Sequence, residues 1–115
     1  MDRIHYAGDS ILTGTEIARA LLEYAQALAV AGTSATVDIP IVNEADGSIG
    51  RSELLIGPAS QLISDTEESQ YDDALDPDLV TRMYDEAARL RRYGSHVPSA
   101  VTAVDDGEAI PDFDL

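Results

Sequence analysis

The residues best suited to covalent chemistry lie near the start of the chain. Gly8-Asp9-Ser10 follows the apolar and aromatic stretch at 4–6, so Ser10 would lie at a tight turn. A serine becomes a nucleophile only when a base takes its proton and nearby donors stabilise the oxyanion. The chain has two histidines, His5 and His96, and the sequence identifies neither as that base. We therefore expect that Ser10 belongs to a turn and is not catalytic.

The segment 4–14 resembles the first block of the GDSL (SGNH) esterases, in which Gly-Asp-Ser after a first strand presents the nucleophile. This resemblance implies that Ser10 is the catalytic serine. The family pattern also holds an oxyanion Asn and an Asp three residues before a late His. Here the single Asn is Asn43, in a predicted turn, and Tyr93 stands three residues before His96. A degenerate GDSL-like hydrolase centred on Ser10 is therefore the alternative function.

The positive charge is concentrated in one predicted helix. All seven basic residues are Arg, and Arg89, Arg91 and Arg92 would occupy the last turn of a helix over 77–94. Cations there complement the helix dipole, so a salt-bridged surface is the simplest interpretation. The functional interpretation is a positive site that binds an acidic segment, such as the C-terminal tail of this or a neighbouring chain.

The tail over 95–115 is predicted to be irregular, and its last eleven residues combine acidity with a few apolar side chains. In composition it resembles the C-terminal recognition peptides of bacterial single-strand-binding proteins and of the division protein FtsZ. Such peptides combine charge with apolar anchors, here Ile110, Pro111 and Phe113. We expect 105–115 to be an interaction element outside the core, the alternative being a solubilising terminus.

The overall charge narrows the classes of partner. The chain carries 22 acidic against seven basic residues, a net charge of −15 over 115 residues. Such a surface repels phosphate backbones and anionic lipids, so neither nucleic acid nor membrane is an expected partner. No apolar run approaches the ~18 residues of a membrane span, and no leader pattern is visible, which predicts a cytoplasmic protein.

Cofactor and disulfide chemistry have no support in the sequence. The chain has no Cys, which excludes disulfides and thiolate ligands. It has no His pair at helical spacing and no glycine-rich phosphate-binding loop. We therefore expect no metal site and no cofactor.

Hydrophobic periodicity predicts an α+β fold with a mostly antiparallel sheet built from two hairpins in the order ββαββ. The first hairpin covers 4–12, and the strands of the second cover 36–42 and 49–56. Between them, a capping box of Thr13 and Glu16 would start a helix that ends at Gly32. Its apolar face is expected to pack on the sheet through these residues: Ile17, Leu21, Tyr24 and Leu28, against Val37, Ile39, Ile41, Leu54 and Ile56.

The chain divides into four predicted parts. Residues 1–64 form the compact ββαββ unit, 65–76 an acidic linker, 77–94 the second helix and 95–115 the acidic tail. Asp76 as N-cap and Pro77 in the first turn mark the start of that second helix.

The arrangement is similar to that of small uncharacterised proteins of high-GC actinobacteria, and this resemblance implies no activity. It rests on Arg3, Tyr6 and Gly8, the hairpin reaching Gly50-Arg51, and Pro58 before the second helix. The function that we infer from the residues is a non-enzymatic, small acidic interaction module or assembly subunit. One version is an acidic mimic that occupies a nucleic-acid-binding protein. The expected partner is another protein or a second copy of this chain. A homodimer is plausible because two helices leave part of the apolar surface of the sheet uncovered, and a second copy would bury it.

Overall fold

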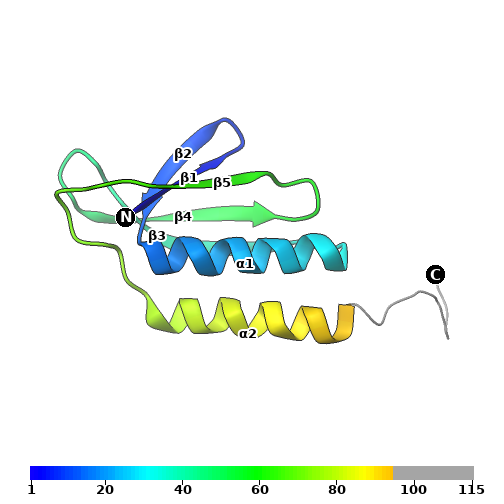
Figure 1. Ribbon diagram of the computed structural model, residues 1–115. Helices are drawn as coiled ribbons and strands as arrows, with labels where there is room; N and C mark the ends of the chain where they lie inside the picture. The colour runs from blue at the N-terminus through cyan, green and yellow to red at the C-terminus, as the bar shows by residue number, and fades with distance from the viewer. Residues whose placement is uncertain (95–115) are drawn as a thin grey trace, which may run out of the picture.

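The computed structural model describes residues 1–94 of the chain. Over these residues the protein is α+β, with antiparallel strands and two helices, as predicted (Figure 1). The elements follow one another as β1 Asp2–Tyr6, β2 Asp9–Thr13, α1 Thr15–Ala31, β3 Ala35–Val42, β4 Ile49–Ile56, β5 Leu62–Thr66 and α2 Pro77–Gly94.

The first hairpin forms as predicted, but the expectation that Ser10 belongs to its turn is wrong, because Ser10 lies in β2 and pairs with His5. β1 and β2 pair with Tyr6 opposite Asp9, which leaves Ala7 and Gly8 as a two-residue turn. Both have positive φ, 55° and 81°, as a type I′ hairpin turn requires. β5 pairs with the other edge of β1, giving a three-stranded sheet in the order β2-β1-β5. β5 therefore continues to Thr66, past the predicted boundary at 64.

β3 and β4 form a separate two-stranded sheet, where the sequence suggested one continuous sheet. Pro40 explains the division, because it lacks a backbone N–H where β3 approaches the end of β2. The hydroxyl of Thr13 supplies the connection by donating to the Pro40 carbonyl at 2.7 Å. The two sheets thus meet through a buried side-chain hydrogen bond.

The predicted capping box at the start of α1 is wrong. Thr13 belongs to β2 and its hydroxyl is used by Pro40, so Gly14 is the N-cap and provides no side-chain bond. A carboxylate distant in sequence replaces the cap, because the Thr15 N–H donates to Asp73 at 3.1 Å. The predicted end at Gly32 is confirmed, with φ at 71°.

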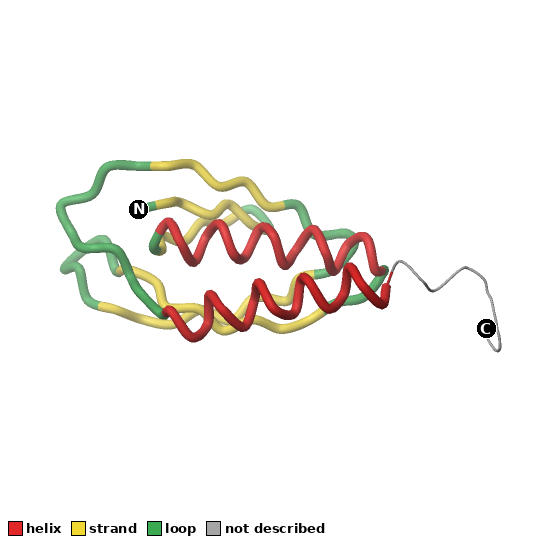
Figure 2. The backbone as a smooth tube through the Cα atoms, turned by 60° about the horizontal axis from the view of Figure 1, so that its bottom comes forward, coloured by secondary structure: helices red, strands yellow, loops and turns green. Residues whose placement is uncertain are grey.

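The second helix begins as predicted, since the Leu79 N–H donates to Asp76 at 3.1 Å and Pro77 is the first helical residue. Figures 1 and 2 show both helices on the same side of the strands, running side by side in the same direction. α2 is amphipathic: Leu79, Met83 and Ala87 are buried, while its other face is exposed.

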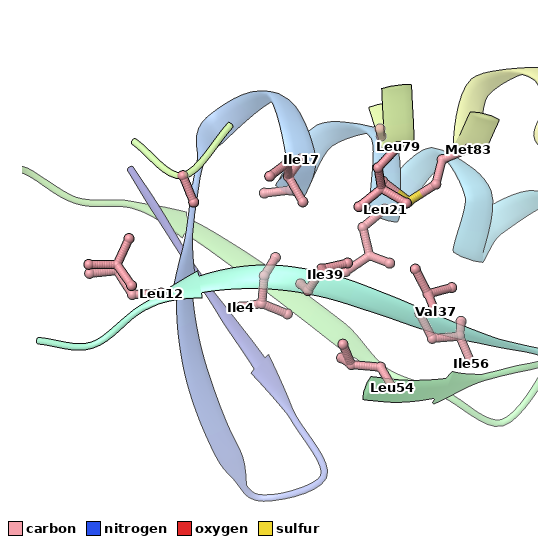
Figure 3. Packing of buried hydrophobic residues seen from close by; sticks show 14 of the residues in the cluster. Ile4, Leu12, Ile17, Leu21, Val37, Ile39, Leu54, Ile56, Leu79 and Met83 are labelled. Carbon is pink, nitrogen blue, oxygen red and sulfur yellow. The ribbon is translucent and has the colours of Figure 1, made fainter. Parts of the chain in front are cut away.

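The core lies between α1, α2 and the strands (Figure 3). The predicted contributors from α1, with one exception, are buried: Ile17, Leu21 and Leu28, with Val37, Ile39, Leu54 and Ile56 from the sheet. The exception is Tyr24, which is partly buried, and Ile41 of β3 is also only partly buried. The charges of Glu86 and Arg89 on α2 act on the Tyr24 phenol. Burial raises the pKa of this phenol.

Candidate functional site

An open groove of about 1030 Å³, which we call the hairpin groove, lies beside the first hairpin. The first hairpin forms one wall with residues 5–10, and the β4–β5 connection at 57–61 forms the other. Ser34, Leu55 and Ile63 complete the lining. A smaller hollow of about 150 Å³ adjoins it and shares Tyr6, Asp9 and Ser10.

Ser10 lies in this groove directly across the hairpin from His5. Residues opposite each other on antiparallel strands project from the same face of the sheet. The His5 Nε2 is 3.1 Å from a carboxylate oxygen of Asp65, which lies on β5. Ser, His and Asp side chains thus gather at one edge of the groove.

The Ser10 hydroxyl is nevertheless bonded to a cation and not to a base. Its Oγ accepts a hydrogen bond from Arg3 Nη1 at 3.2 Å. Within residues 1–94, no hydrogen bond joins Ser10 to the His5 ring. His96 lies outside these residues. The described geometry therefore leaves Ser10 without the base that a nucleophile requires.

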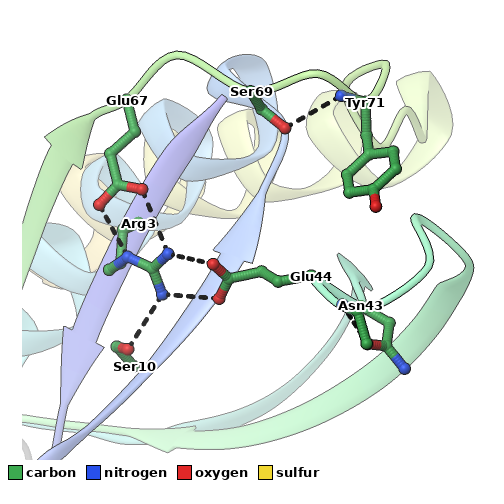
Figure 4. A network of polar contacts seen from close by, with 8 residues as sticks. Arg3, Ser10, Asn43, Glu44, Glu67, Ser69 and Tyr71 are labelled. Carbon is green, nitrogen blue, oxygen red and sulfur yellow. Dashed lines mark hydrogen bonds and ion pairs between the residues drawn. The ribbon is translucent and has the colours of Figure 1, made fainter.

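Arg3 is the centre of the most extended polar network on this face (Figure 4). Its guanidinium binds Glu67 at 2.7 and 3.2 Å and Glu44 at 2.7 and 3.0 Å, with two hydrogen bonds to each. Paired hydrogen bonds of this kind fix orientation as well as charge. Arg3 therefore joins β1 to the β3–β4 loop and to the segment after β5.

The network also changes the ionisation of its members. Hydrogen bonds to Glu44 and Glu67 raise the pKa of Arg3 above its usual value. The hydrogen bond from Arg3 lowers the pKa of Glu44. Both shifts stabilise the charged forms of Arg3 and Glu44.

A second polar network joins the start of α1 to the strands. The buried carboxylate of Asp2 accepts from the hydroxyls of Thr15 at 2.9 Å and Ser64 at 3.0 Å. Asp73 accepts from the Thr15 N–H, and this bond is the largest cause that lowers the pKa of Asp73. These contacts hold the stretch before α2 against β1 and α1.

The arginines at the end of α2 are engaged with the fold. Arg89 pairs with Glu86 at 2.6 Å within the helix. Arg91 contacts Glu23 and Gln26 of α1, which connects the two helices. Arg92 lies on the exposed face and also has an interaction partner.

The remaining predicted site residues lie outside the described part of the chain: Ile110, Pro111 and Phe113. Among residues 1–94, no group of three or more His, Cys, Asp or Glu side chains is arranged to hold a metal ion. In the same part of the chain, neither helix has an apolar stretch long enough to cross a membrane.

Sequence reasoning missed Leu55 and Ile63 of the groove, although the sequence contains a signal for both. Leu54-Leu55-Ile56 and Leu62-Ile63 place consecutive apolar residues in strands whose side chains alternate between faces. At least one residue of each run must face away from the core.

Comparison of the chain with protein-family models, curated proteins and solved structures finds no match.

Proposed function

We propose that this protein is a non-enzymatic interaction module that binds a cationic protein partner. The observation that carries the proposal is the charge imbalance of the folded part, in which residues 1–94 hold 17 acidic residues against seven Arg. Complementary charge accelerates association, and like charge suppresses the wrong partners. A basic protein is therefore the favoured partner, and a nucleic acid or an anionic membrane is disfavoured.

Four of the seven arginines pair with carboxylates within the fold, and the carboxylates outside these pairs still outnumber the other three arginines. Arg3, Arg51, Arg89 and Arg91 each have a carboxylate partner. Exposed carboxylates outside these ion pairs include Glu16, Glu53 and Glu68. Such side chains remain available to a partner that carries Lys or Arg.

Affinity capture from a lysate of the native host tests the partner class. We expect the full chain, immobilised at 0.15 M NaCl, to retain a dominant binder that is basic. We also expect release as salt rises, because the screening length shortens from about 8 Å to about 3 Å at 1 M. A matched column carrying the Glu16→Gln, Glu53→Gln, Glu68→Gln triple variant should retain less. An acidic dominant binder, or retention that is insensitive to salt, would contradict the proposal.

The C-terminal segment is the second expected element of the module. Deleting 105–115 should leave the melting temperature unchanged but weaken partner binding or self-association into a homodimer. Its proposed docking site is the end of α2 with Arg89, Arg91 and Arg92, on the same or a neighbouring chain. An exposed ion pair contributes only about 0–1 kcal/mol, so the apolar side chains must supply the rest.

The matched control keeps the length and charge of this segment and replaces only Ile110, Pro111 and Phe113 with Ala. Calorimetry and sedimentation velocity measure stability and oligomeric state for both variants. If the truncated chain unfolds, the segment belongs to the core. If partner binding and oligomeric state are unchanged, it is only a solubilising end.

The second candidate function is serine hydrolysis, favoured by the position of Ser10 across from His5 and by the His5–Asp65 contact. We expect no turnover of p-nitrophenyl acetate that depends on Ser10, because Arg3 and not a base contacts its hydroxyl. The assay compares the native chain with Ser10→Ala and His5→Ala. Hydrolysis that both substitutions abolish would establish the hydrolase in place of the interaction module.

A further inference from the structure

We propose that the hairpin groove is the docking site for a cationic segment of the partner that also carries aliphatic side chains. The inference rests on the proposed function and assigns a site to it. Four features support it: exposed aliphatic side chains, preformed walls, acidic groups at the rim, and the charge of the competing occupants.

Two large aliphatic side chains of the groove are exposed to solvent. Leu55 is 63% exposed and Ile63 is 60% exposed, and both line the groove. Leu55 lies opposite Thr36 on the outer face of β4, and Ile63 lies opposite His5 on β1. Neither contributes to the core. Removing them from water would stabilise a complex through the hydrophobic effect.

The walls of the groove are held in place before any partner arrives. In the β4–β5 connection, the Gly57 N–H donates to the Ser60 hydroxyl at 2.9 Å, and the Ser60 N–H donates to the Gly57 carbonyl at 3.0 Å. Tyr6 crosses from β1 and donates its hydroxyl to the Leu55 carbonyl. A preformed site loses less conformational entropy on binding.

The opposite wall contains a strained residue. Ala7 is the one residue other than glycine with positive φ in the described part of the chain, at 55°. This conformation disfavours a residue with a Cβ and is more common at functional sites than elsewhere. Ala7 is among the residues that line the groove.

The acidic side chains at the rim favour a positively charged occupant. Asp9 lines the groove and is exposed, and Asp65 contacts His5 beside it. Glu53, also exposed, lines the adjoining hollow that shares Asp9. The described lining of both hollows contains no Arg, and the nearby Arg3, which donates to Ser10, is paired with Glu44 and Glu67. A Lys or Arg in the occupant would meet Asp9 in the groove and Glu53 in the adjoining hollow.

The same charges disfavour the other occupants that this chain could supply. The segment 95–115 carries five acidic side chains and no Lys or Arg, so the rim would repel it. A second copy brings a net charge of −15 to the same face. The occupant that fits is a segment of another protein in which Lys or Arg alternates with aliphatic residues. Its cations would pair with the acidic side chains of the rim, and its aliphatic side chains would cover Leu55 and Ile63.

Titration with a defined peptide locates the site. The probe is a heptapeptide in which Arg and Leu alternate, added to the isotope-labelled full chain and followed by amide chemical shifts. We expect the largest shifts at 7–10 and 57–63. A peptide with Glu in place of Arg should cause none, and one with Ser in place of Leu should bind more weakly. Largest shifts elsewhere on the surface, or equal binding of the Glu peptide, would overturn the proposal.

Matched substitutions test the role of the exposed side chains. Leu55→Ser should weaken binding of the Arg-Leu peptide by about tenfold, because it removes an aliphatic anchor. Leu75→Ser makes the same change at a residue 74% exposed and outside the groove, and should leave affinity within about twofold. Asp9→Asn should weaken binding by about two- to fivefold, with Asp72→Asn, the same change at an exposed residue outside the groove, as its control.

Equal affinities for Leu55→Ser and Leu75→Ser would overturn the groove as the docking site. This failure is distinguishable from failure of the proposed function. If the Leu55→Ser chain still retains the basic partner of the capture experiment at full affinity, the function stands and the site is wrong. If no basic protein is retained by the native chain, the function itself is wrong.

Discussion

Replacing Gly14 with alanine is expected to destabilise the protein by about 3 kcal/mol or more, the upper part of the range for overpacking. A Cβ at this position would lie 2.0 Å from the carbonyl oxygen of Ala74 and 3.2 Å from its carbonyl carbon. Both are backbone atoms, so no side-chain rotation relieves the clash. The segment that must move also carries Asp73, which caps α1 through Thr15.

The backbone conformation of Gly14 isolates packing as the cause. Its φ of −69° and ψ of 150° are accessible to alanine, so the substitution introduces no conformational strain. Gly50→Ala is the matched control, because its Cβ would meet Ile41 at an ordinary 3.7 Å. We expect a change within about 0.5 kcal/mol there. Urea denaturation measures both, and equal stabilities would show that Ala74 does not pack on Gly14.

The sequence was sufficient to predict the local features of this fold. The turn-forming residues 7–10 between two apolar stretches predict the first hairpin, although Asp9 and Ser10 belong to β2, and Asp76-Pro77 predicts the start of α2. Each depends on residues a few positions apart, whose geometry the backbone determines without the rest of the protein. The end of α1 at Gly32 is of the same kind.

The polar contacts that organise the candidate site could not be predicted from the sequence, because the two residues of each contact are distant along the chain. Arg3 binds Glu44, 41 residues away, and Glu67, 64 residues away. The local capping box failed for the same reason, since β2 continues to Thr13 and Asp73 caps α1 instead. The acidic stretch 65–76, interpreted as a linker, provides two of these distant partners.

The groove likewise depends on tertiary structure. The sequence placed His5 and Ser10 in one hairpin, but it did not indicate that β5 would bring Asp65 and Ile63 to the same face. The groove also requires Leu55 of β4 to lie near the first hairpin, a contact made through Tyr6. Consecutive apolar residues in a strand show that one of them is exposed, but not what surface surrounds it.

Leu21→Ala is expected to lower the free energy of unfolding by about 2–5 kcal/mol, the range for removing a buried Leu side chain. Leu21 is 0% exposed and lies where α1 meets both the strands and α2. Figure 3 shows it between Ile39 of β3 and the Leu79–Met83 face of α2. A cavity at this junction removes contacts to both neighbours, so the value should fall in the upper half of the range.

Leu75→Ala is the control for that substitution, because it makes the same chemical change at a residue that is 74% exposed. It should alter stability by no more than about 0.5 kcal/mol. Thermal and urea denaturation of the two variants measure the difference directly. If both lose the same stability, Leu21 does not occupy the junction, and the packing of α2 on α1 is wrong. If Leu21→Ala alone is destabilised, and added Met83→Ala costs less than it does in the native chain, the two side chains share one core across the helices.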